Sequence, residues 1–482
     1  MMEEGDEGAS SGPVGAEAIP QYLDLHSTLP TQAGIEKKVF RLVPPTHSIG
    51  GTGPIAFDLP TSSDEQILPC GVRVMTKVKI VNEDGSPLAV ENPRGTFHFN
   101  DVVIPVNGIG HAMFSDIEVR VNDQKIASFD GNYGYRGNLE NLLFTSLESK
   151  AGAGQLAGYA MPNFYAYDWI NNEAGLRRWL NFEGRGNDDI VKKDTLPYDN
   201  GKVWGARFYK SQDSNVTCYI DRLYSDLFNQ PLALPPGAKL SVQLERASSK
   251  FCLLSHSDKN LKLEVVSCHL IVPFIKTEQS FVEQIEYTNF GGQPMRYPML
   301  RVEISKYTKP GGLFDLSEDN ILLGSVTPRR IFVALVSSES VNGHQMRDPF
   351  LYQGFAVGSI AVKIGGQQAS APAYEMNYAH RDFAQPLFFL LTALGIEGGS
   401  TPENGLNPQT YSPHNCVYGF DMNGLAGVEM SEAFVREVRS PTGLEIKLRS
   451  ASTEAITVIV YKEFDAELTI DSNGKLQMHD HA

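Results

Sequence analysis

Alternation of apolar and polar residues with a period of two is the sequence feature that most constrains this fold. Eight segments carry it: residues 72–80, 117–121, 240–244, 261–265, 301–304, 360–364, 444–448 and 456–460. This period buries one face of a strand and leaves the other face in solvent. Turn residues follow several of these segments, as at 82–85 and 471–474. Antiparallel strands joined by long loops favour β-sandwiches over parallel βαβ units.

An ordered internal repeat predicts two such sandwiches in tandem. The segment 117–124 recurs as 360–367, with Gln124 and Gln367 at the same place, and 240–248 recurs as 444–452. The first offset is 243 residues and the second is 204, so the first copy holds about 39 additional residues. Copies in the same order indicate a tandem duplication. We assign the surplus to a loop insertion at about 151–216, which is rich in Gly, Asn and aromatic residues.

Few helices are expected, and two can be placed. Residues 138–148 place Leu139, Leu142 and Leu143 on one face behind Asn138, which is a good N-cap residue. A second, shorter helix is expected at 386–394, with Pro in its first turn and Gly immediately after its end. Apolar helical stripes of this kind face a core, so both helices are expected to pack on sheets.

The charge balance makes nucleic acid an unsuitable ligand. The 482 residues include 41 Lys and Arg against 57 Asp and Glu, a net charge of −16, with no long basic cluster. A surface that neutralises phosphates needs a basic face, so we expect no sequence-specific nucleic-acid binding. The longest apolar run, 386–394, is half of the ~20 residues that a transmembrane helix needs. The first residues are acidic where a signal peptide would be basic and then apolar, so secretion by that route is not expected.

No motif nominates a catalytic, cofactor-binding or metal-ligating residue. The Walker, H-E-x-x-H, G-x-S-x-G and Rossmann patterns do not occur. The histidines are scattered, and the pair His479 and His481 lacks a fixed third ligand. The N-glycosylation sequon at Asn215 matters only in a secretory compartment. Five cysteines at wide spacings predict free, mostly buried thiols: Cys70, Cys218, Cys252, Cys268 and Cys416.

Several stretches, taken in order, resemble one protein family. In the second half they are residues 297–303, 320–336 and 342–350, followed by 458–471; in the first half they are 112–119, 133–136, 227–232 and 245–251. The likeness covers about residues 22–472. In this order they resemble the hexon-like proteins of Polinton and adintovirus-type mobile elements and of their animal-genome copies.

The resemblance implies a double jelly-roll major capsid protein, similar in plan to adenovirus and tectivirus coat proteins. The implied fold is all-β, with two tandem eight-stranded jelly-roll β-sandwiches and a few short helices in loops. Such proteins form homotrimers with pseudo-hexameric outlines that tile an icosahedral shell, next to neighbouring capsomers and minor capsid or penton proteins. The family has no catalytic residues, cofactors or metal ligands to carry over. It implies a place in the virion after synthesis inside a host cell.

The repeat and the resemblance together predict the domain plan. A flexible acidic arm spans 1–21, the first jelly roll 22–278 with the insertion at about 151–216, and the second jelly roll 279–472. The arm holds almost nothing large to bury, so its ordering entropy is not offset. The polar residues 473–482 are expected to form a loose tail.

Three other functions fit the same sequence less well. The first is a minor capsid or penton protein of the same virion. The second is a two-sandwich glycan hydrolase of the peptide-N-glycanase kind, which would need a carboxyl group of raised pKa in a cleft between the domains. The third is a glycan-binding sandwich that uses Trp169, Trp179 and Trp204, although buried tryptophans are the commoner outcome in sandwiches.

Overall fold

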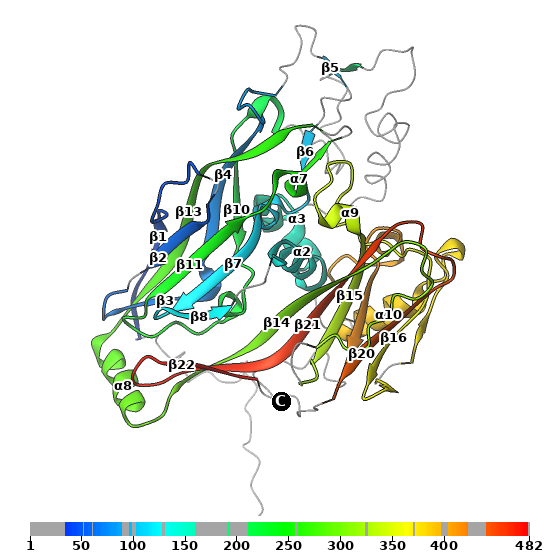
Figure 1. Cartoon of the computed structure of the whole chain (residues 1–482). Helices are drawn as coiled ribbons and strands as arrows, with labels where there is room; N and C mark the ends of the chain where they lie inside the picture. Colours follow the sequence, from blue (N-terminus) through cyan, green and yellow to red (C-terminus); the bar gives the residue numbers. More distant parts are fainter. Residues whose placement is uncertain are drawn as a thin grey trace, which may run out of the picture.

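The computed structural model places two β-sandwiches side by side, with helices between them (Figure 1). It describes residues 34–51, 53–59, 61–88, 96–98, 103–127, 131–159, 190–192, 211–255, 259–322, 326–369, 372–396, 403–422 and 440–480. The predicted acidic arm and the three tryptophans Trp169, Trp179 and Trp204 lie outside the described residues. All strand pairings within the main sheets are antiparallel, as the alternation predicts.

The first sandwich contains a five-stranded sheet packed face to face with a four-stranded sheet. The first of these sheets has the order β1 (Ile35–Val43), β13 (Leu261–Thr277), β4 (Arg73–Asn82) and β10 (Thr217–Arg222), and β3 (Glu65–Ile67) also pairs with β13. The second has the order β2 (Ile55–Leu59), β11 (Leu240–Arg246), β7 (Phe114–Val121) and β8 (Gln124–Ala127). Two short pairs lie outside these sheets: β6 (Val103–Pro105) with β12 (Leu253–Ser255), and β5 (Thr96–His98) with β9 (Ile190–Lys192). Eight main strands that alternate in this way between two sheets have the arrangement of a jelly roll.

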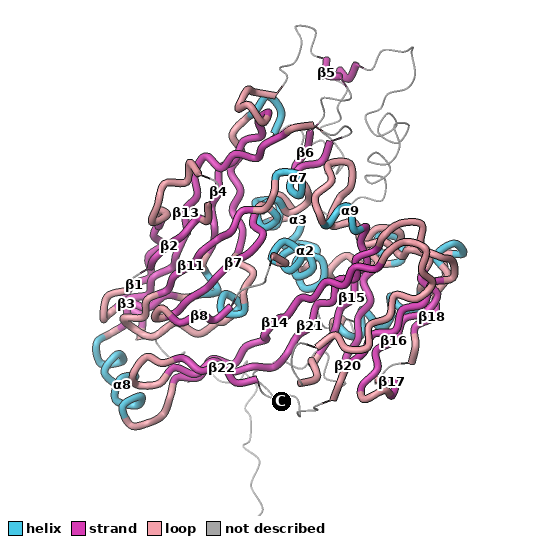
Figure 2. The backbone as a smooth tube through the Cα atoms, in the orientation of Figure 1, coloured by secondary structure: helices cyan, strands magenta, loops and turns pink. Residues whose placement is uncertain are grey.

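The second sandwich repeats this arrangement (Figure 2). One sheet has the order β14 (Met295–Lys309), β21 (Ile456–Ile470), β15 (Arg330–Ser337) and β19 (Val417–Asp421). In the other sheet β16 (Val357–Ile364) pairs with β17 (Gln367–Gln368), β18 (Tyr374–Glu375) and β20 (Thr442–Leu448). Residues 314–318 take the place of β2, because the Leu316 amide donates to the Ile446 carbonyl (2.9 Å) and the Glu318 amide donates to the Leu444 carbonyl (2.8 Å).

The predicted duplication is confirmed at the level of strands. The repeated segments form β7 paired with β11 in one sandwich and β16 paired with β20 in the other. Gln124 opposite Val121 and Gln367 opposite Ile364 occupy the same place in their hairpins, as the 243-residue offset requires. The second repeat is shifted by two residues in the structure. Ile117 lies opposite Leu244, so the 204-residue offset would place Leu448 opposite Ile360, but Ile446 lies there. A shift of two leaves every side chain on its face, so the core pattern is unchanged.

The helix prediction for 138–148 is wrong at its start. Helix α2 (Tyr133–Phe144) begins five residues earlier, after Asn132, and α3 (Leu147–Ala151) follows it. Gly134 and Gly137 hide the first turns because glycine has low helix propensity, but both sit where α2 packs closely on its neighbours. The second prediction is confirmed by α10 (Ala384–Ala393), which ends before Gly395 at a left-handed φ of 70°.

One helix was not predicted. Helix α8 (Gln279–Phe290) connects β13 of the first sandwich to β14 of the second. The other helical turns are short: α1 (Ile109–Ala112), α7 (Ser249–Cys252), α9 (Ser338–Val341), α11 (Pro408–Tyr411), η2 (Pro69–Gly71), η4 (Ala153–Ala157), η6 (Gln212–Ser214), η7 (Asp226–Asn229) and η8 (Tyr378–His380). No helix of the described ranges is long and apolar enough to cross a bilayer.

The predicted loose tail is also wrong. Residues 476–480 form β22 (Leu476–Asp480), which pairs with the end of β21. Leu476 and Met478 are partly buried against the core, and the Leu476 amide donates to the Gln124 side chain of the first sandwich (3.1 Å). The polar composition of this segment did not prevent strand pairing. The end of β21 has backbone groups available to pair with β22, and the alternate apolar residues Leu476 and Met478 pack against the core.

Candidate assembly surfaces

The outer face of one sheet of the second sandwich is covered by the first sandwich. Phe144, at the end of α2, lies edge-on to Phe332 of β15, with ring centroids 5.5 Å apart. It also lies 6.2 Å from the ring of Tyr461 on β21, and the Arg330 guanidinium lies 5.2 Å from its centroid. The Asn132 side chain donates to the Ile304 carbonyl of β14 (3.2 Å). As a result β21 is buried at all 15 of its positions, with apolar cores on both sides.

Charged side chains are enclosed at this junction. Arg136 of α2 is fully buried; its Nε lies 2.6 Å from Glu140, and its Nη2 lies 2.8 Å from Asp226. Asp226 also accepts from the Val302 amide of β14 (3.3 Å), which joins the two sandwiches. Burial disfavours the charged guanidinium, but the carboxylates of Asp226 and Glu140 outweigh it and raise the pKa of Arg136. The arginine therefore stays charged in the interior.

His111 of α1 sits beside this cluster in a space kept open by glycine. Its Nδ1 lies 3.0 Å from Asp221, and the ring is fully buried. A Cβ at Gly108 would fall 2.2 Å from its Cε1, and one at Gly137 would fall 2.6 Å from its Cδ2. Such distances exclude any other residue unless the imidazole moves. No group of three metal-binding side chains occurs among the described residues, and His111 has the surroundings of a packed core histidine.

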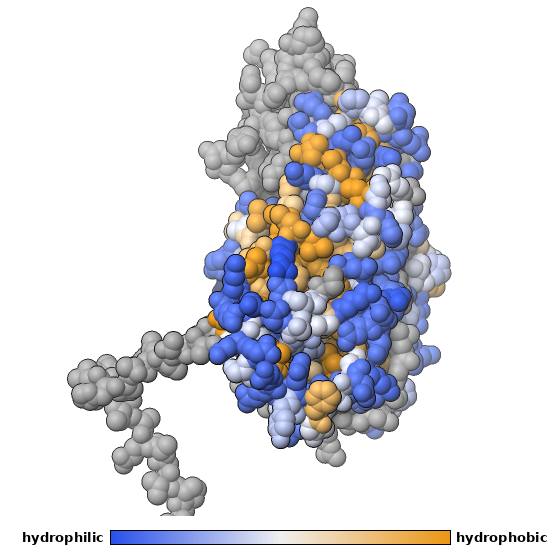
Figure 3. Space-filling model, turned by 90° about the vertical axis from the view of Figure 1, so that its left-hand side faces the viewer, coloured by the Kyte–Doolittle hydropathy of each residue, from blue (hydrophilic) through white to orange (hydrophobic). Residues whose placement is uncertain are grey.

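No described residue covers the equivalent face of the first sandwich. Seven of the nine residues of β1 are exposed, and Phe40 and Leu42 each expose 60% of their surface. Their neighbours on the outer face include Ile271 of β13 and Met75 of β4, both half-buried. Figure 3 views the side that carries β1, and hydrophobic residues form a band across it. We call this the open face, defined by the outward side chains of β1, β13, β4 and β10.

Two further apolar features are exposed. On α10, Leu387 and Leu390 are buried while Phe388 points outward with 55% of its surface exposed. On α8, only Val282 is buried, and Phe281, Tyr287 and Phe290 are exposed. Single exposed apolar residues are normal on a monomer, but contiguous groups mark contact sites.

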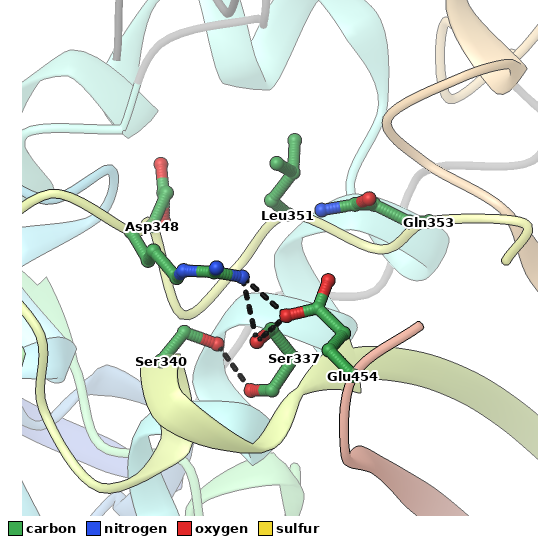
Figure 4. Close-up of a pocket in the computed structure, with 7 residues that line it drawn as sticks. Ser337, Ser340, Asp348, Leu351, Gln353 and Glu454 are labelled. Carbon is green, nitrogen blue, oxygen red and sulfur yellow. Dashed lines mark hydrogen bonds and ion pairs between the residues drawn. The ribbon is translucent and has the colours of Figure 1, made fainter. Parts of the chain in front are cut away.

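A polar cavity of about 250 Å³ lies at the end of β15 (Figure 4). It is lined by Ser337, Ser340, Arg347, Asp348, Leu351, Gln353 and Glu454. Its polar groups bind one another: Ser337 donates to Glu454 (2.8 Å), Arg347 donates to Ser337 (3.0 Å) and pairs with Glu454, and Ser340 donates to the Ser337 carbonyl (2.7 Å). This arrangement ties α9 to the turn before β21 and is typical of a structural clamp.

Comparisons with known proteins agree on the architecture. No family model matches the chain. Over 444 residues it is 22% identical to the uncharacterized protein F54H12.2 of Caenorhabditis elegans, across 92% of this chain and 97% of that protein. It is similar to the cryo-EM structure of the Sputnik virophage, with a TM-score of 0.62 and 11% identity across 98% of this chain and 95% of that one. It is also similar to the faustovirus major capsid protein, with a TM-score of 0.54 and 9% identity across 95% and 92% of the two chains. The chain is a double jelly roll.

This double jelly roll confirms the predicted fold class, and it places the residues that the sequence singled out. All five cysteines are free, as predicted; Cys252, Cys268 and Cys416 are buried, Cys70 is half-buried and Cys218 is exposed on β10. Asn215 is exposed just before β10, and His479 is exposed on β22. None of these groups converges with another on a site within the described ranges.

Sequence reasoning missed the residues that distinguish the two faces of the double jelly roll. Phe40 and Leu42 lie in a strand whose alternation is broken by adjacent lysines and a register shift near Ile35. Phe388 lies in an apolar run in which outward and inward residues look alike. Pairing of Arg136 with Asp226 spans 90 residues, and no local pattern signals it.

Proposed function

We propose that this protein is a major capsid protein, a structural component of a virion whose homotrimers tile an icosahedral shell. The observation that carries the proposal is that one chain contains two topologically equivalent sandwiches. The outer face of the β21 sheet in the second sandwich is covered, whereas described residues leave the equivalent face of the β1 sheet in the first sandwich exposed. Three chains supply six similar sandwiches, which gives a trimer a pseudo-hexameric outline. The likeness to the Sputnik virophage structure and to the faustovirus major capsid protein across nearly the whole chain supports the same role.

The proposed domain plan follows the sequence. The first jelly roll spans 22–278 and the second 279–472, with the connection in α8 after β13 ends at Thr277. The acidic arm, 1–21, and the insertion at about 151–216 are proposed to contact neighbouring capsomers or minor capsid and penton proteins. We assign no enzymatic activity, cofactor or metal to the chain, and we place it in the virion after synthesis inside the host cell.

Light scattering across a salt series tests the proposal. We expect a closed trimer of about 159 kDa, three times the chain mass of 53.0 kDa. Each chain carries a net charge of −16, so salt screens repulsion between copies while apolar burial persists. The trimer should therefore survive high salt, and negative-stain microscopy should show three-fold particles or shells. A monomer at every salt and at micromolar protein would overturn the capsid proposal.

A further inference from the structure

Helix α8 is attached to the rest of the molecule along one narrow face. It lies at the opposite end of the first sandwich from β6 and α7 (Figure 1). Val282 is buried, and Ile285 and Asn289, which come three and seven positions later, are half-buried. The Asn289 side chain donates to the Asp471 carbonyl in the turn before β22 (3.5 Å). Residues at these spacings share one side of a helix, so the opposite side of α8 points away from the protein.

This opposite side carries two aromatic rings and two carboxylates. Tyr287 and Phe290 are three positions apart and expose 82% and 78% of their surface. Glu283 lies four positions before Tyr287, and Glu286 lies four positions before Phe290, so the four side chains form one contiguous patch. We call this patch the outer face of α8. Large rings exposed side by side mark a contact site, because burial would remove them from water.

The described residues do not compensate the charges on the outer face of α8. Glu283 and Glu286 form no ion pair with any residue that the structure describes. The nearest basic residues in the sequence, Lys276 and Arg296, pair with carboxylates elsewhere, at 3.0 Å each. The last turn of α8 has no basic residue, although the carbonyl groups at a helix C-terminus attract cations. This face is therefore negative as well as aromatic.

We propose that the outer face of α8 binds a lysine- or arginine-rich amphipathic helix of another protein. Apolar residues of that helix cover the rings of Tyr287 and Phe290, while its cations pair with Glu283 and Glu286 or lie over the rings. Helix α8 has 12 residues and is about 18 Å long, so a partner helix of about three turns spans it. That the partner is a virion protein rests on the proposed function, whereas its cationic chemistry follows from α8 alone.

Charge disfavours the other occupants that an exposed helix face attracts. Nucleic acid and anionic membranes would meet carboxylates here and no basic side chain. The arm at 1–21 has five acidic residues and no basic residue, so it would be repelled as well. A second copy of α8 packed on the first would bring four carboxylates together, two from each copy. A cationic partner gains both apolar burial and electrostatic attraction.

A synthetic peptide tests the proposal with the full-length protein. The probe is a fluorescent helical peptide of about 18 residues made of Leu, Lys and Ala, with leucines along one side and lysines flanking them. Fluorescence anisotropy measures its dissociation constant. We expect Phe290→Ser to raise this constant about tenfold at every salt concentration, because apolar burial persists in salt. Glu283→Gln combined with Glu286→Gln should raise it about fivefold at low salt and less at high salt.

Matched variants separate the outer face of α8 from the general acidity of a chain with a net charge of −16. Phe314→Ser and Glu375→Gln change exposed residues of the second sandwich and should leave binding unchanged. Glu283→Lys combined with Glu286→Lys should lose the lysine peptide and bind the same peptide with glutamates in place of its lysines. Glu375→Lys combined with Asp382→Lys changes the net charge equally and should not. Equal effects in test and control variants would overturn the proposal.

A photo-crosslinking phenylalanine derivative in place of Phe290 locates the bound peptide. It should crosslink to the lysine peptide, whereas the same derivative in place of Phe314 should not. Circular dichroism checks that each variant is folded, and light scattering reports its oligomeric state separately. A trimer that does not bind the peptide would overturn the α8 proposal and leave the capsid proposal standing. A monomer that binds the peptide at Phe290 would overturn the capsid proposal and support the α8 site.

Discussion

The Arg136 guanidinium lies 2.8 Å from the Asp226 carboxylate, and both side chains are shielded from solvent between the two sandwiches. Neither charge has access to water, so Asp226 depends on Arg136 for compensation, and Arg136 depends on Asp226 and Glu140. Because Asp226 also accepts from the β14 backbone, the pair fixes where the second sandwich docks on the first. The junction is thereby held by directional bonds as well as by apolar packing.

Replacing Arg136 should therefore be costly. We expect Arg136→Met to lower the free energy of unfolding by about 3–5 kcal/mol, because it leaves the buried Asp226 carboxylate without a cationic partner and leaves Glu140 with Arg222 alone. Urea denaturation measures this. The control is Arg120→Met, which removes an exposed partner of Glu118 and should cost less than about 1 kcal/mol. Equal losses in the two variants would show that the buried pair has no special role.

The glycine cradle around His111 makes a steric prediction. Gly137→Ala should destabilise the protein by about 1–3 kcal/mol, although alanine is the better helix former, because its Cβ would lie 2.6 Å from the imidazole. In a His111→Ala background the same change should be neutral or stabilising. Gly134→Ala lies in the same helix, but its Cβ would lie 3.3 Å from the nearest atom, Cε1 of Phe251, so this control should be milder. An unchanged cost in the His111→Ala background would disprove the steric explanation.

Lys150 predicts how stability depends on pH. Its ammonium donates to the carbonyls of Leu142 and Asn404 in an enclosed site, and burial lowers its pKa from 10.5 to about 7. Between those values the unfolded chain binds more protons than the folded chain, so stability rises as pH increases. From pH 7 to pH 9 the wild type should gain about 2 kcal/mol relative to Lys150→Met.

The comparison isolates Lys150 because every other group titrates equally in both proteins. The control is Lys239→Met at an exposed site, where the pKa is raised by the Asp123 hydrogen bond and stays above this pH window. Thermal melts at several pH values give the difference. A difference that is flat from pH 7 to pH 9, or that falls, would contradict a lowered pKa at Lys150.

Thiol chemistry separates buried from accessible cysteines. Burial raises the pKa of Cys252 and Cys416 to about 12 and that of Cys268 to about 11, so these three thiols should not react with a disulfide reagent while the protein is folded. After unfolding without reductant, all five should react. Recovery of fewer than five would mean that a disulfide had formed, and rapid reaction of more than two in the folded protein would contradict the packing.

The strands were predictable where one face meets a core and the other meets solvent. The segments 117–121 and 240–244 show this, and their structural neighbours in the second copy follow the same rule. By contrast β21 runs through 15 buried residues, and alternation revealed only its beginning at 456–460, because its later charged residues are enclosed by partners distant in sequence. Alternation along a strand indicates burial on one face only, whereas β21 contacts a hydrophobic core on each of its two faces.

The helix start and the open face were unpredictable for a related reason. Asn138 is a good cap residue in isolation, yet it lies inside α2, where its side chain accepts from the Tyr352 hydroxyl of the second sandwich (2.9 Å). Phe40 and Leu42 are apolar residues of a strand, and only their neighbours in space show that nothing in the described chain covers them. Both outcomes depend on docking between sandwiches, which no single segment encodes.

Phe144 of α2 and Phe332 of β15 are in contact, and both residues belong to the same covalent chain. Dilution does not weaken such a contact, whereas a contact between separate copies loses about 4 kcal/mol over a thousandfold dilution. Half of the sandwich-to-sandwich contacts in a six-sandwich ring are therefore already made in every newly folded chain. The equilibrium concentration of a ring made of three chains then depends on the third power of the free chain concentration. For a ring made of six separate sandwiches it would depend on the sixth power.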